Sequence, residues 1–283
     1  MIIATSGRPD VVSKTLAILE RQTVQAHEFI ISCVSDSDVG AIPPHLKVKI
    51  VKGAAGLTRQ RNAGLRSVSA ESDIVVFFDD DFVPDFHWIE AAENYFAAHA
   101  DVACLTGALI ADGINGRGLT FDDALRLIES NEPSNNSLAL PGYSPYGCNM
   151  AFRRSAIRSE FFDERLVLYA WQEDRDFGAR VAKHGNLVKI GAAKGVHLGL
   201  KKARISGVKL GYSQVINPFY LWQKGTMSTF DVLSHVGGNM IANIVRSFRP
   251  EPYIDRIGRL RGNAIAFCDL ARGRITPERA AAL

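Results

Sequence analysis

The sequence predicts an α/β protein with a mostly parallel central sheet flanked by helices and a helical appendage at the C-terminus. Short apolar segments alternate with segments of helical periodicity through the first hundred residues. Continuously apolar strands of this kind are typical of parallel sheets that helices cover on both faces. After Phe230 the pattern changes to two long helical stripes. We therefore expect one large domain over residues 1–230 and a basic amphipathic helical extension over residues 231–283.

Each expected element has its own signal in the sequence. Buried strands are expected where apolar residues run together, at residues 2–6, 28–35, 48–52 and 73–78. One helix is expected from Pro9, which suits an early helical position, and a second over residues 57–68. Trp88, Ala92 and Tyr95 share one face of a third helix. Ligands of such sheets bind beyond the carboxyl ends of the strands, so the loops that follow the strands are candidate site segments.

The C-terminal third carries two apolar stripes and an excess of positive charge. The first stripe contains Val232, Val236, Met240, Ile244 and Phe248, and the second contains Ile254, Ile257, Leu260, Ala264 and Phe267. From Leu198 onward the chain has thirteen basic and five acidic residues, a net charge of +8, against −5 before it. This asymmetry favours an anionic partner. Two roles stay open for the helices: contact with an anionic membrane surface, or packing against the large domain.

Composition excludes several classes of protein. The chain has 283 residues, of which 47% are hydrophobic and 22% charged, so it is not a disordered polymer. No apolar run reaches the roughly 18 residues of a membrane span, and no export signal is recognisable. The four cysteines lack zinc-site spacing, so we expect buried, reduced thiols in a cytoplasmic protein. Nucleic-acid binding gains no support from any motif.

Two acidic clusters carry most of the functional argument. Asp79, Asp80 and Asp81 follow directly on an apolar strand, where a hard divalent cation would relieve their mutual repulsion. The alternative is a solvated loop that caps the next helix. Glu173 and Asp174 precede a helical stretch, and they suit either catalysis or the first turn of that helix.

With these clusters in view, the sequence resembles the inverting GT-A glycosyltransferases of family 2, over about residues 1–200. Five segments carry the resemblance in the order of the family: IIATSGRP, GLTRQRNAGL, VVFFDDDFVPD, GCNMAFRR and QED. The resemblance implies a GT-A fold and a metal-dependent transfer of a hexosyl group, with inversion, from a nucleoside-diphosphate sugar to an acceptor hydroxyl. A UDP-sugar and a GDP-sugar both fit as donor.

The resemblance also implies roles for individual residues. Those expected at the nucleotide are Ser6, Arg8, Asp36, Arg61, Asn62, Asp79 and Asp80. Those expected to hold a divalent metal, Mn²⁺ or Mg²⁺, are Asp81 and His197. Those expected to border the sugar and acceptor are Gly147, Cys148, Asn149 and Trp171. Asp174 is the expected general base, with Glu173 beside it. The second strand ends in SDSD where the family has a D-D-G-S-like turn, so Asp36 departs from the family pattern.

The chemistry suits these residue types. Displacement of a nucleoside diphosphate builds negative charge on the leaving phosphate, which a cation stabilises. The acceptor hydroxyl gives its proton to a carboxylate as it attacks, and attack from the opposite face inverts the anomeric carbon. The resemblance implies a glycan or lipid-linked acceptor in bacterial cell-surface polysaccharide or glycolipid synthesis, at the inner face of the cytoplasmic membrane.

Three other interpretations compete with the transferase. DDDFV fits the motif of haloacid-dehalogenase-like phosphohydrolases, but that motif belongs on the first strand of its domain. A non-catalytic nucleotide-sugar-binding protein would keep the same residues without turnover. A dinucleotide dehydrogenase is disfavoured because no GxGxxG follows the first strand.

The basic segment at 199–223, with Lys201, Lys202 and Arg204, suits either closure over the diphosphate or a solvated loop.

Overall fold

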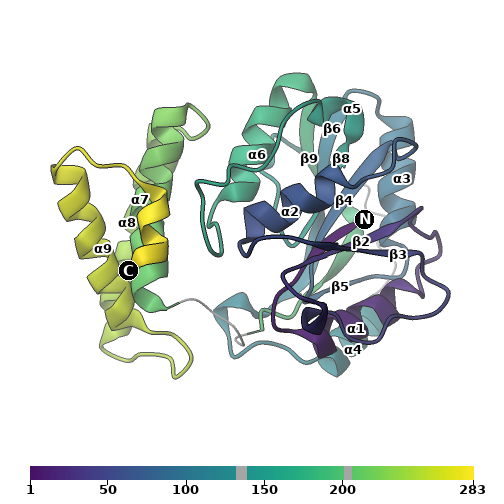
Figure 1. Cartoon of the computed structure of the whole chain (residues 1–283), viewed down its shortest axis with the longest axis horizontal. Coiled ribbons are helices and arrows are strands. Elements are labelled where there is room, and N and C mark those ends of the chain that lie inside the picture. Colours follow the sequence, from purple (N-terminus) through teal and green to yellow (C-terminus); the bar gives the residue numbers. More distant parts are fainter. Residues whose placement is uncertain (132–138, 201–205) are drawn as a thin grey trace. The chain divides into compact units, whose positions relative to one another are not determined.

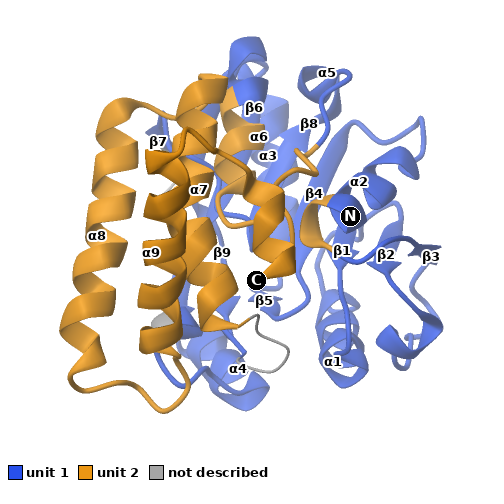
Figure 2. Cartoon of the chain, turned by 60° about the vertical axis from the view of Figure 1, so that its left-hand side comes forward, with its two compact units in different colours: residues 1–55, 59–161, 180–203 blue, residues 56–58, 162–179, 204–283 orange. Residues whose placement is uncertain are grey.

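The computed structural model of the chain describes residues 1–131, 139–200 and 206–283. Contacts divide the chain into two compact units, coloured separately in Figure 2. Unit 1 comprises residues 1–55, 59–161 and 180–203, and unit 2 comprises residues 56–58, 162–179 and 204–283. The large domain predicted over residues 1–230 draws on both units, so its boundary stays a prediction. Lys201, Lys202 and Arg204 lie outside the described residues.

Strands and helices alternate through the first hundred residues, as the sequence predicts, and further strands and helices continue to residue 197. In chain order the main elements are β1 (Ile2–Ala4), α1 (Pro9–Leu19), β2 (Phe29–Cys33), β3 (Val48–Lys52), α2 (Leu57–Arg66), β4 (Ile74–Asp79), β5 (Phe82–Pro84), α3 (Trp88–Ala98), β6 (Val102–Asp112), α4 (Phe121–Ser130), β7 (Ala139–Pro141), β8 (Asn149–Arg153), α5 (Arg154–Ile157), α6 (Glu173–Val181) and β9 (Asn186–His197). Pro9 occupies the start of α1, where its missing N–H costs no hydrogen bond.

The strands form one sheet in the order β3-β2-β1-β4-β8-β6-β9-β5, with β7 paired to β9 (Figures 1 and 2). The first four are parallel neighbours, and Ala4 of β1 lies level with Ser32 of β2 and Asp79 of β4. Beyond β4 the sheet is mixed, because β8 runs antiparallel to both β4 and β6 while β9 runs parallel to β6. The carboxyl ends of β1, β2 and β4 therefore meet at one edge, where the predicted site segments begin.

The core of unit 1 lies between the sheet and its helices. Trp88, Ala92 and Phe96 recur every four residues along α3 and are buried. The Trp88 ring meets the Phe78 ring edge to face, with 4.7 Å between centroids. Cys33, Cys104 and Cys148 are buried free thiols, whereas Cys268 is exposed, which corrects the expectation for that residue. Within the described residues, no helix is long and apolar enough to cross a membrane.

Unit 2 contains the helical appendage. Its elements after residue 206 are α7 (Gly207–Lys224), α8 (Thr229–Ser247), α9 (Arg256–Ala271) and the short helix η4 (Pro277–Ala282) (Figure 2). Glycines let α7 and α9 pack backbone against backbone. A Cβ on Gly211 would lie 2.1 Å from the Arg259 carbonyl oxygen, and one on Gly262 would lie 2.1 Å from the Val208 carbonyl oxygen. The third helix, α8, also contacts both.

The two stripes predicted for the appendage are buried only in part. Val232 and Val236 of α8 enter the core shared with α7 and α9, but Ile244 and Phe248 are exposed. The buried face of α8 turns instead toward Asn243, whose side-chain amide donates to Gln214 of α7 and to Asn263 of α9. A polar network therefore takes the place of part of the expected apolar stripe.

Candidate active site

The acidic cluster lies at the sheet edge where β1 and β4 end. Asp79 is the last residue of β4, and its backbone N–H donates to the Cys148 carbonyl oxygen. The three carboxylates make different sets of contacts. Asp80 is fully buried and pairs with Arg8, Asp79 pairs with Arg61 of α2, and Asp81 lies near His197 of β9 and, at 3.6 Å, near Arg8 as well.

Asp80 is fully buried and anchors the segment after β1. Its carboxylate accepts a hydrogen bond from Thr5 Oγ1 at 2.7 Å and forms an ion pair with Arg8 at 2.7 Å. Its carbonyl oxygen accepts from Thr15 Oγ1 of α1 at 2.6 Å. Burial raises the pKa of Asp80 to about 7, although the nearby Arg8 guanidinium opposes the shift. Asp80 therefore holds Arg8 in place at the cluster.

Asp79, Asp81 and His197 come together from β4, the turn that follows it and β9. One ligand atom of each residue lies within 4.8 Å of the others. His197 Nε2 is 3.5 Å from Asp81 Oδ1, and Asp81 Oδ2 accepts from the Leu200 N–H at 2.9 Å. Two carboxylates and an imidazole are a donor set that suits Mn²⁺ or another first-row divalent ion. The sequence analysis assigned Asp79 to the nucleotide, and the structure adds it to the candidate metal ligands.

Asp112 and Tyr146 form an outer layer around His197 that the sequence analysis missed. Asp112 lies level with His197 in the register of β6 and β9, and its Oδ1 is 2.9 Å from His197 Nδ1. The Tyr146 hydroxyl donates to Asp112 Oδ2 at 2.9 Å. Burial alone would lower the pKa of His197, but hydrogen bonds to Asp112 and Asp81 raise it to about 10. With Nδ1 turned to Asp112, Nε2 is the nitrogen that faces the two carboxylates.

Arg61 and Asn62 lie on α2, and both are buried. The Arg61 guanidinium donates to Asp79 Oδ1 at 2.9 Å and to the Gly147 carbonyl oxygen at 2.8 Å. It therefore links the acidic cluster to the segment before β8. Because this side chain is only 2% exposed, its position is fixed by packing as well as by these bonds.

The turn after β2 contains Asp36, whose expected role at the nucleotide stays a prediction. Asp36 is exposed and pairs with Lys52 at 3.0 Å. Asp38 is the buried carboxylate of this turn, and it accepts from the backbone N–H groups of Gly7, Val34 and Ser35. The Gly7 bond, at 2.7 Å, joins the turn to the exposed Ser6–Gly7 segment after β1. A left-handed φ of 67° at Gly7 explains the glycine there.

The segment Gly147–Cys148–Asn149 is buried at the start of β8. The Asn149 amide oxygen accepts from Thr106 Oγ1 at 3.0 Å and from the Gly107 N–H at 2.9 Å. These hydrogen bonds link β8 to β6, so the Asn149 side chain stabilises the pairing of the two strands. The role of the three residues at the sugar and acceptor stays a prediction.

Trp171, Glu173 and Asp174 belong to unit 2; Trp171 lies within a strained segment of backbone, and Glu173 and Asp174 follow it. Leu168, Ala170 and Gln172 have positive φ values of 63°, 53° and 79°. Non-glycine residues rarely adopt this conformation, and when they do they cluster at functional sites.

The strained segment leads directly into the first turn of α6, where Glu173 is buried and Asp174 is half-buried. The Asp174 carboxylate accepts from the Arg175 N–H at 2.7 Å, and Arg175 in turn pairs with Asp231 of α8. Trp171 meets the His235 ring edge to face. The expected base thus lies on a turn that the appendage braces.

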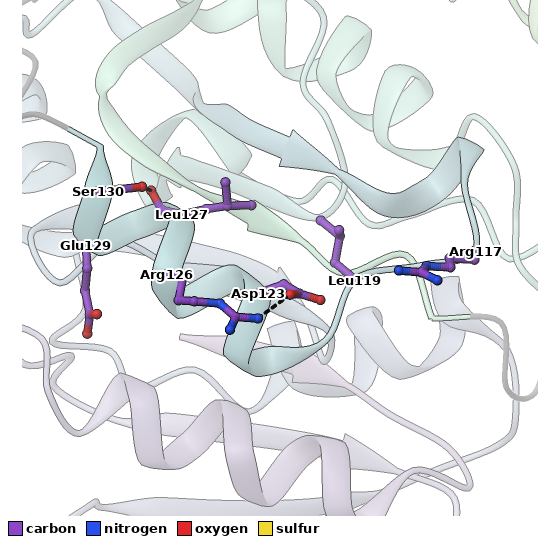
Figure 3. Close-up of a pocket in the computed structure, with 7 residues that line it drawn as sticks. All are labelled: Arg117, Leu119, Asp123, Arg126, Leu127, Glu129 and Ser130. Atoms are coloured by element: carbon purple, nitrogen blue, oxygen red, sulfur yellow. Dashed lines mark hydrogen bonds and ion pairs between the residues drawn. The ribbon is translucent and has the colours of Figure 1, made fainter.

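A separate pocket lies along α4 in unit 1 (Figure 3). It is lined by Arg117, Leu119, Asp123, Arg126, Leu127, Glu129 and Ser130. Arg126 pairs with Asp123, which also forms a capping box with Thr120 at the start of α4. None of the site residues expected from the sequence lines this pocket, so we assign it no part in the site.

Comparison with known structures supports the GT-A architecture. A crystal structure of S. aureus TarS 1–349 matches with a TM-score of 0.53 at 14% identity, over 100% of this chain and 82% of that one. A crystal structure of GalNAc-T7 with UDP, GalNAc and Mn²⁺ matches with a TM-score of 0.52 at 12% identity. That match covers 98% of this chain and 56% of GalNAc-T7. At such identities the likeness shows a shared fold.

Sequence comparison assigns the family. No match is found among curated protein sequences. The profile of glycosyl transferase family 2 matches residues 1–161, which is more than half of the chain and includes the Ser6–Arg8 segment, the Asp79–Asp81 cluster and Gly147–Asn149. The GT-A fold of the neighbours agrees with this match. The chain therefore belongs to glycosyl transferase family 2.

Proposed function

We propose that this protein is a metal-dependent, inverting glycosyltransferase that moves a hexosyl group from a nucleoside-diphosphate sugar to an acceptor hydroxyl. One observation carries the proposal: the donor atoms of Asp79, Asp81 and His197 lie within 4.8 Å of one another, in a family 2 domain. Arg8 and Arg61 flank this cluster with buried or half-buried guanidinium groups. Carboxylates, an imidazole and fixed cations together suit a metal–diphosphate ligand.

Asp79, Asp81 and His197 would hold the ion, and Mn²⁺ fits this donor set better than Mg²⁺ because one ligand is an imidazole. When bound, the ion supplies electrostatic stabilisation of the negative charge that builds on the leaving diphosphate. The protein's own task is to hold the ligands in one arrangement. Asp112 orients His197, the Leu200 N–H orients Asp81, and Arg61 orients Asp79. Such supporting contacts raise ligand precision and metal affinity.

Asp174 is the proposed general base. It takes the proton of the acceptor hydroxyl as that oxygen attacks the anomeric carbon, and the leaving diphosphate departs from the opposite face. The strained turn at Leu168–Gln172 and the bond from the Arg175 N–H support this role, because they fix the carboxylate at the start of α6. Trp171, next to this turn, would stack on a sugar ring. Buried Glu173 supports the turn.

The donor we propose is a UDP-sugar, since the GalNAc-T7 neighbour was crystallised with UDP and Mn²⁺. Ser6, Arg8, Arg61, Asn62 and Asp80 would line or support the nucleotide pocket. The proposed acceptor is a glycan or a lipid-linked saccharide at the inner face of the cytoplasmic membrane. Exposed arginines after the start of α9, among them Arg261, Arg272 and Arg274, support an anionic surface or acceptor phosphate as the contact.

Turnover of the donor tests this proposal without knowledge of the acceptor. UDP- and GDP-sugars are incubated with the protein, with Mn²⁺ or with EDTA, and release of the nucleoside diphosphate is measured with and without a panel of saccharide acceptors. We expect release from one donor class only, dependent on Mn²⁺ and abolished in Asp81→Ala. A Glu129→Gln variant, at the α4 pocket, serves as control. Release of phosphate from a phosphomonoester instead would identify a phosphohydrolase, and binding without turnover would identify a non-catalytic protein.

A further inference from the structure

Helix α8 of unit 2 presents an apolar stripe to solvent. The exposed members, which share one face of the helix at 100° per residue, are Phe230, Leu233, Ile241, Ile244, Val245 and the C-cap residue Phe248. Phe230 and Phe248, at the two ends, are 80% and 82% exposed. These side chains are distinct from Val232 and Val236, which fill the core on the other face. The stripe therefore stays exposed although the opposite face of α8 packs against the other helices of unit 2.

The stripe is large enough to form a stable contact. Its six side chains expose about two-thirds of their surface, which is roughly 700 Å² per chain if each carries about 180 Å². Monomeric proteins rarely expose one apolar patch above roughly 300–600 Å², and a specific protein interface buries roughly 800 Å² per partner. One copy of the stripe thus supplies close to half of a standard interface.

Charge argues that the occupant is apolar and neutral rather than an anionic membrane. Residues 232–245 contain no Asp, Glu, Lys or Arg. Two charged residues that flank the stripe are paired, Asp231 with Arg175 and Arg246 with Glu251, and beyond its end Arg249 adds one exposed cation. A helix that lies on an anionic bilayer carries Lys and Arg along its polar face, and α8 does not. A second neutral apolar helix fits this face better.

The order of residues along the stripe makes it complementary to itself. Consider two antiparallel copies of α8 that cross at residue 239. Phe230 of one copy then lies level with Phe248 of the other, Leu233 with Val245, and Gly237 with Ile241. Two copies of α8 that lie antiparallel would therefore put aromatic beside aromatic at both ends and a large side chain beside a glycine near the centre. Such pairing of one patch with itself is the arrangement that a two-fold axis requires.

The glycines near the centre have room for a partner. A Cβ on Gly237 or Gly238 would meet no atom within 4 Å. The glycines between α7 and α9 differ, because a Cβ on Gly211 or Gly262 would collide with the neighbouring backbone. Between α7 and α9, glycine thus allows close helix packing against a partner helix that is present. The same kind of surface recurs at Gly237 and Gly238 of α8, where no described residue packs against it.

We infer that the protein forms a homodimer through antiparallel packing of α8 against α8 of a second copy, with the two-fold axis near residue 239. This inference does not depend on the transferase activity. The dimer buries the stripe of both copies. In this register Leu233 of one copy lies beside Ile244 and Val245 of the other, and Ile241 fills the space above Gly237.

Sedimentation velocity of the full chain tests the inference, with variants that introduce opposite charges at two positions of the proposed interface. We expect the wild type, of 31.0 kDa, to sediment as a dimer at micromolar concentration. Leu233→Glu and Val245→Lys should each weaken the dimer at least 100-fold, since each brings a charge into an apolar seam. The double variant should recover the dimer, because the antiparallel register sets each Glu beside a Lys of the other copy. Gln223→Glu, an exposed change off the stripe, should have no effect.

Each contrary result overturns the inference. A monomeric wild type at 100 μM would refute the dimer. If that monomer also bound neutral or anionic vesicles, and Leu233→Glu abolished the vesicle binding, the stripe would be a lipid-binding face. A dimer that survives both single variants would lie elsewhere on the chain. Failure of the double variant to recover would exclude the antiparallel register. Far-ultraviolet circular dichroism and melting temperature establish that each variant is folded.

Discussion

Asp112→Asn is the substitution that examines the candidate metal centre most closely. Asp112 makes no contact with the proposed metal position, but its carboxylate receives three hydrogen bonds: His197 Nδ1 at 2.9 Å, the Ile114 N–H at 3.0 Å and the Tyr146 hydroxyl at 2.9 Å. Asparagine keeps the shape of the side chain. It removes the negative charge. Only one side-chain oxygen is left to accept hydrogen bonds from the three donors that the two carboxylate oxygens now accept from.

The expected cost follows from this geometry. With an asparagine at position 112, the imidazole loses a charged acceptor that fixes Nδ1–H and directs Nε2 toward Asp79 and Asp81. Loss of such a partner lowers metal affinity about 10- to 100-fold, which is about 1.4–2.7 kcal/mol. The fold should lose less, since Asp112 remains at the end of β6 and its backbone pairing with β9 is unchanged.

Calorimetric titration of Mn²⁺ into the wild type and Asp112→Asn measures this cost. Tyr146→Phe removes only the outermost bond and should lower the affinity less than Asp112→Asn does. Asp122→Asn, an exposed carboxylate on α4, controls for the change in net charge. Equal Mn²⁺ affinity in Asp112→Asn and the wild type, with both proteins folded, would show that Asp112 does not orient a metal ligand, and the account of the site would then be wrong.

Three further predictions concern other parts of the molecule. Asp174→Asn should lower kcat by roughly 10²–10⁴ with little change in donor affinity, as steady-state rates and titration would reveal. Gly211→Ala should destabilise the fold by about 1–3 kcal/mol in urea unfolding, because a Cβ there would collide with the Arg259 backbone. The pKa of His197 is raised from 6.5 to about 10 in the folded, metal-free chain. Its protonation should therefore stabilise that chain fully below pH 6.5, and this stability should disappear as the pH rises through 10. The stability difference between wild type and His197→Gln in EDTA should shrink over that range, and a constant difference would contradict the assignment.

The first four strands, β1 to β4, were predictable from runs of apolar residues in the sequence. All five residues of β2 are buried, β4 is apolar from Ile74 to Phe78 as burial under helices on both faces requires, and Asp79 then ends the strand with a change in polarity. The position of the acidic cluster at a ligand-binding edge followed from the parallel order of the first strands. Family resemblance then added His197, which lies with Asp79 and Asp81 in the structure.

Other features depend on contacts that local sequence does not encode. Asp112 reaches His197 only through the register of β6 and β9, across 85 residues of chain. Asp38 rather than Asp36 holds the turn after β2, since its side chain is the one that reaches the Gly7 N–H. On α8 the helical periodicity was clear, but two faces are apolar, and only the packing of α7 and α9 decides which of them is buried.

The proposed function requires that Asp81 and its neighbours bind a metal–nucleoside diphosphate complex. The most direct measurement is a calorimetric titration of UDP and of GDP, each with and without Mn²⁺, into the wild type and Asp81→Ala. We predict that one diphosphate, UDP, binds in the presence of Mn²⁺, and that omission of the metal or loss of Asp81 weakens binding at least tenfold. Absence of binding by either diphosphate with Mn²⁺ present, or equal binding by Asp81→Ala, would contradict the account.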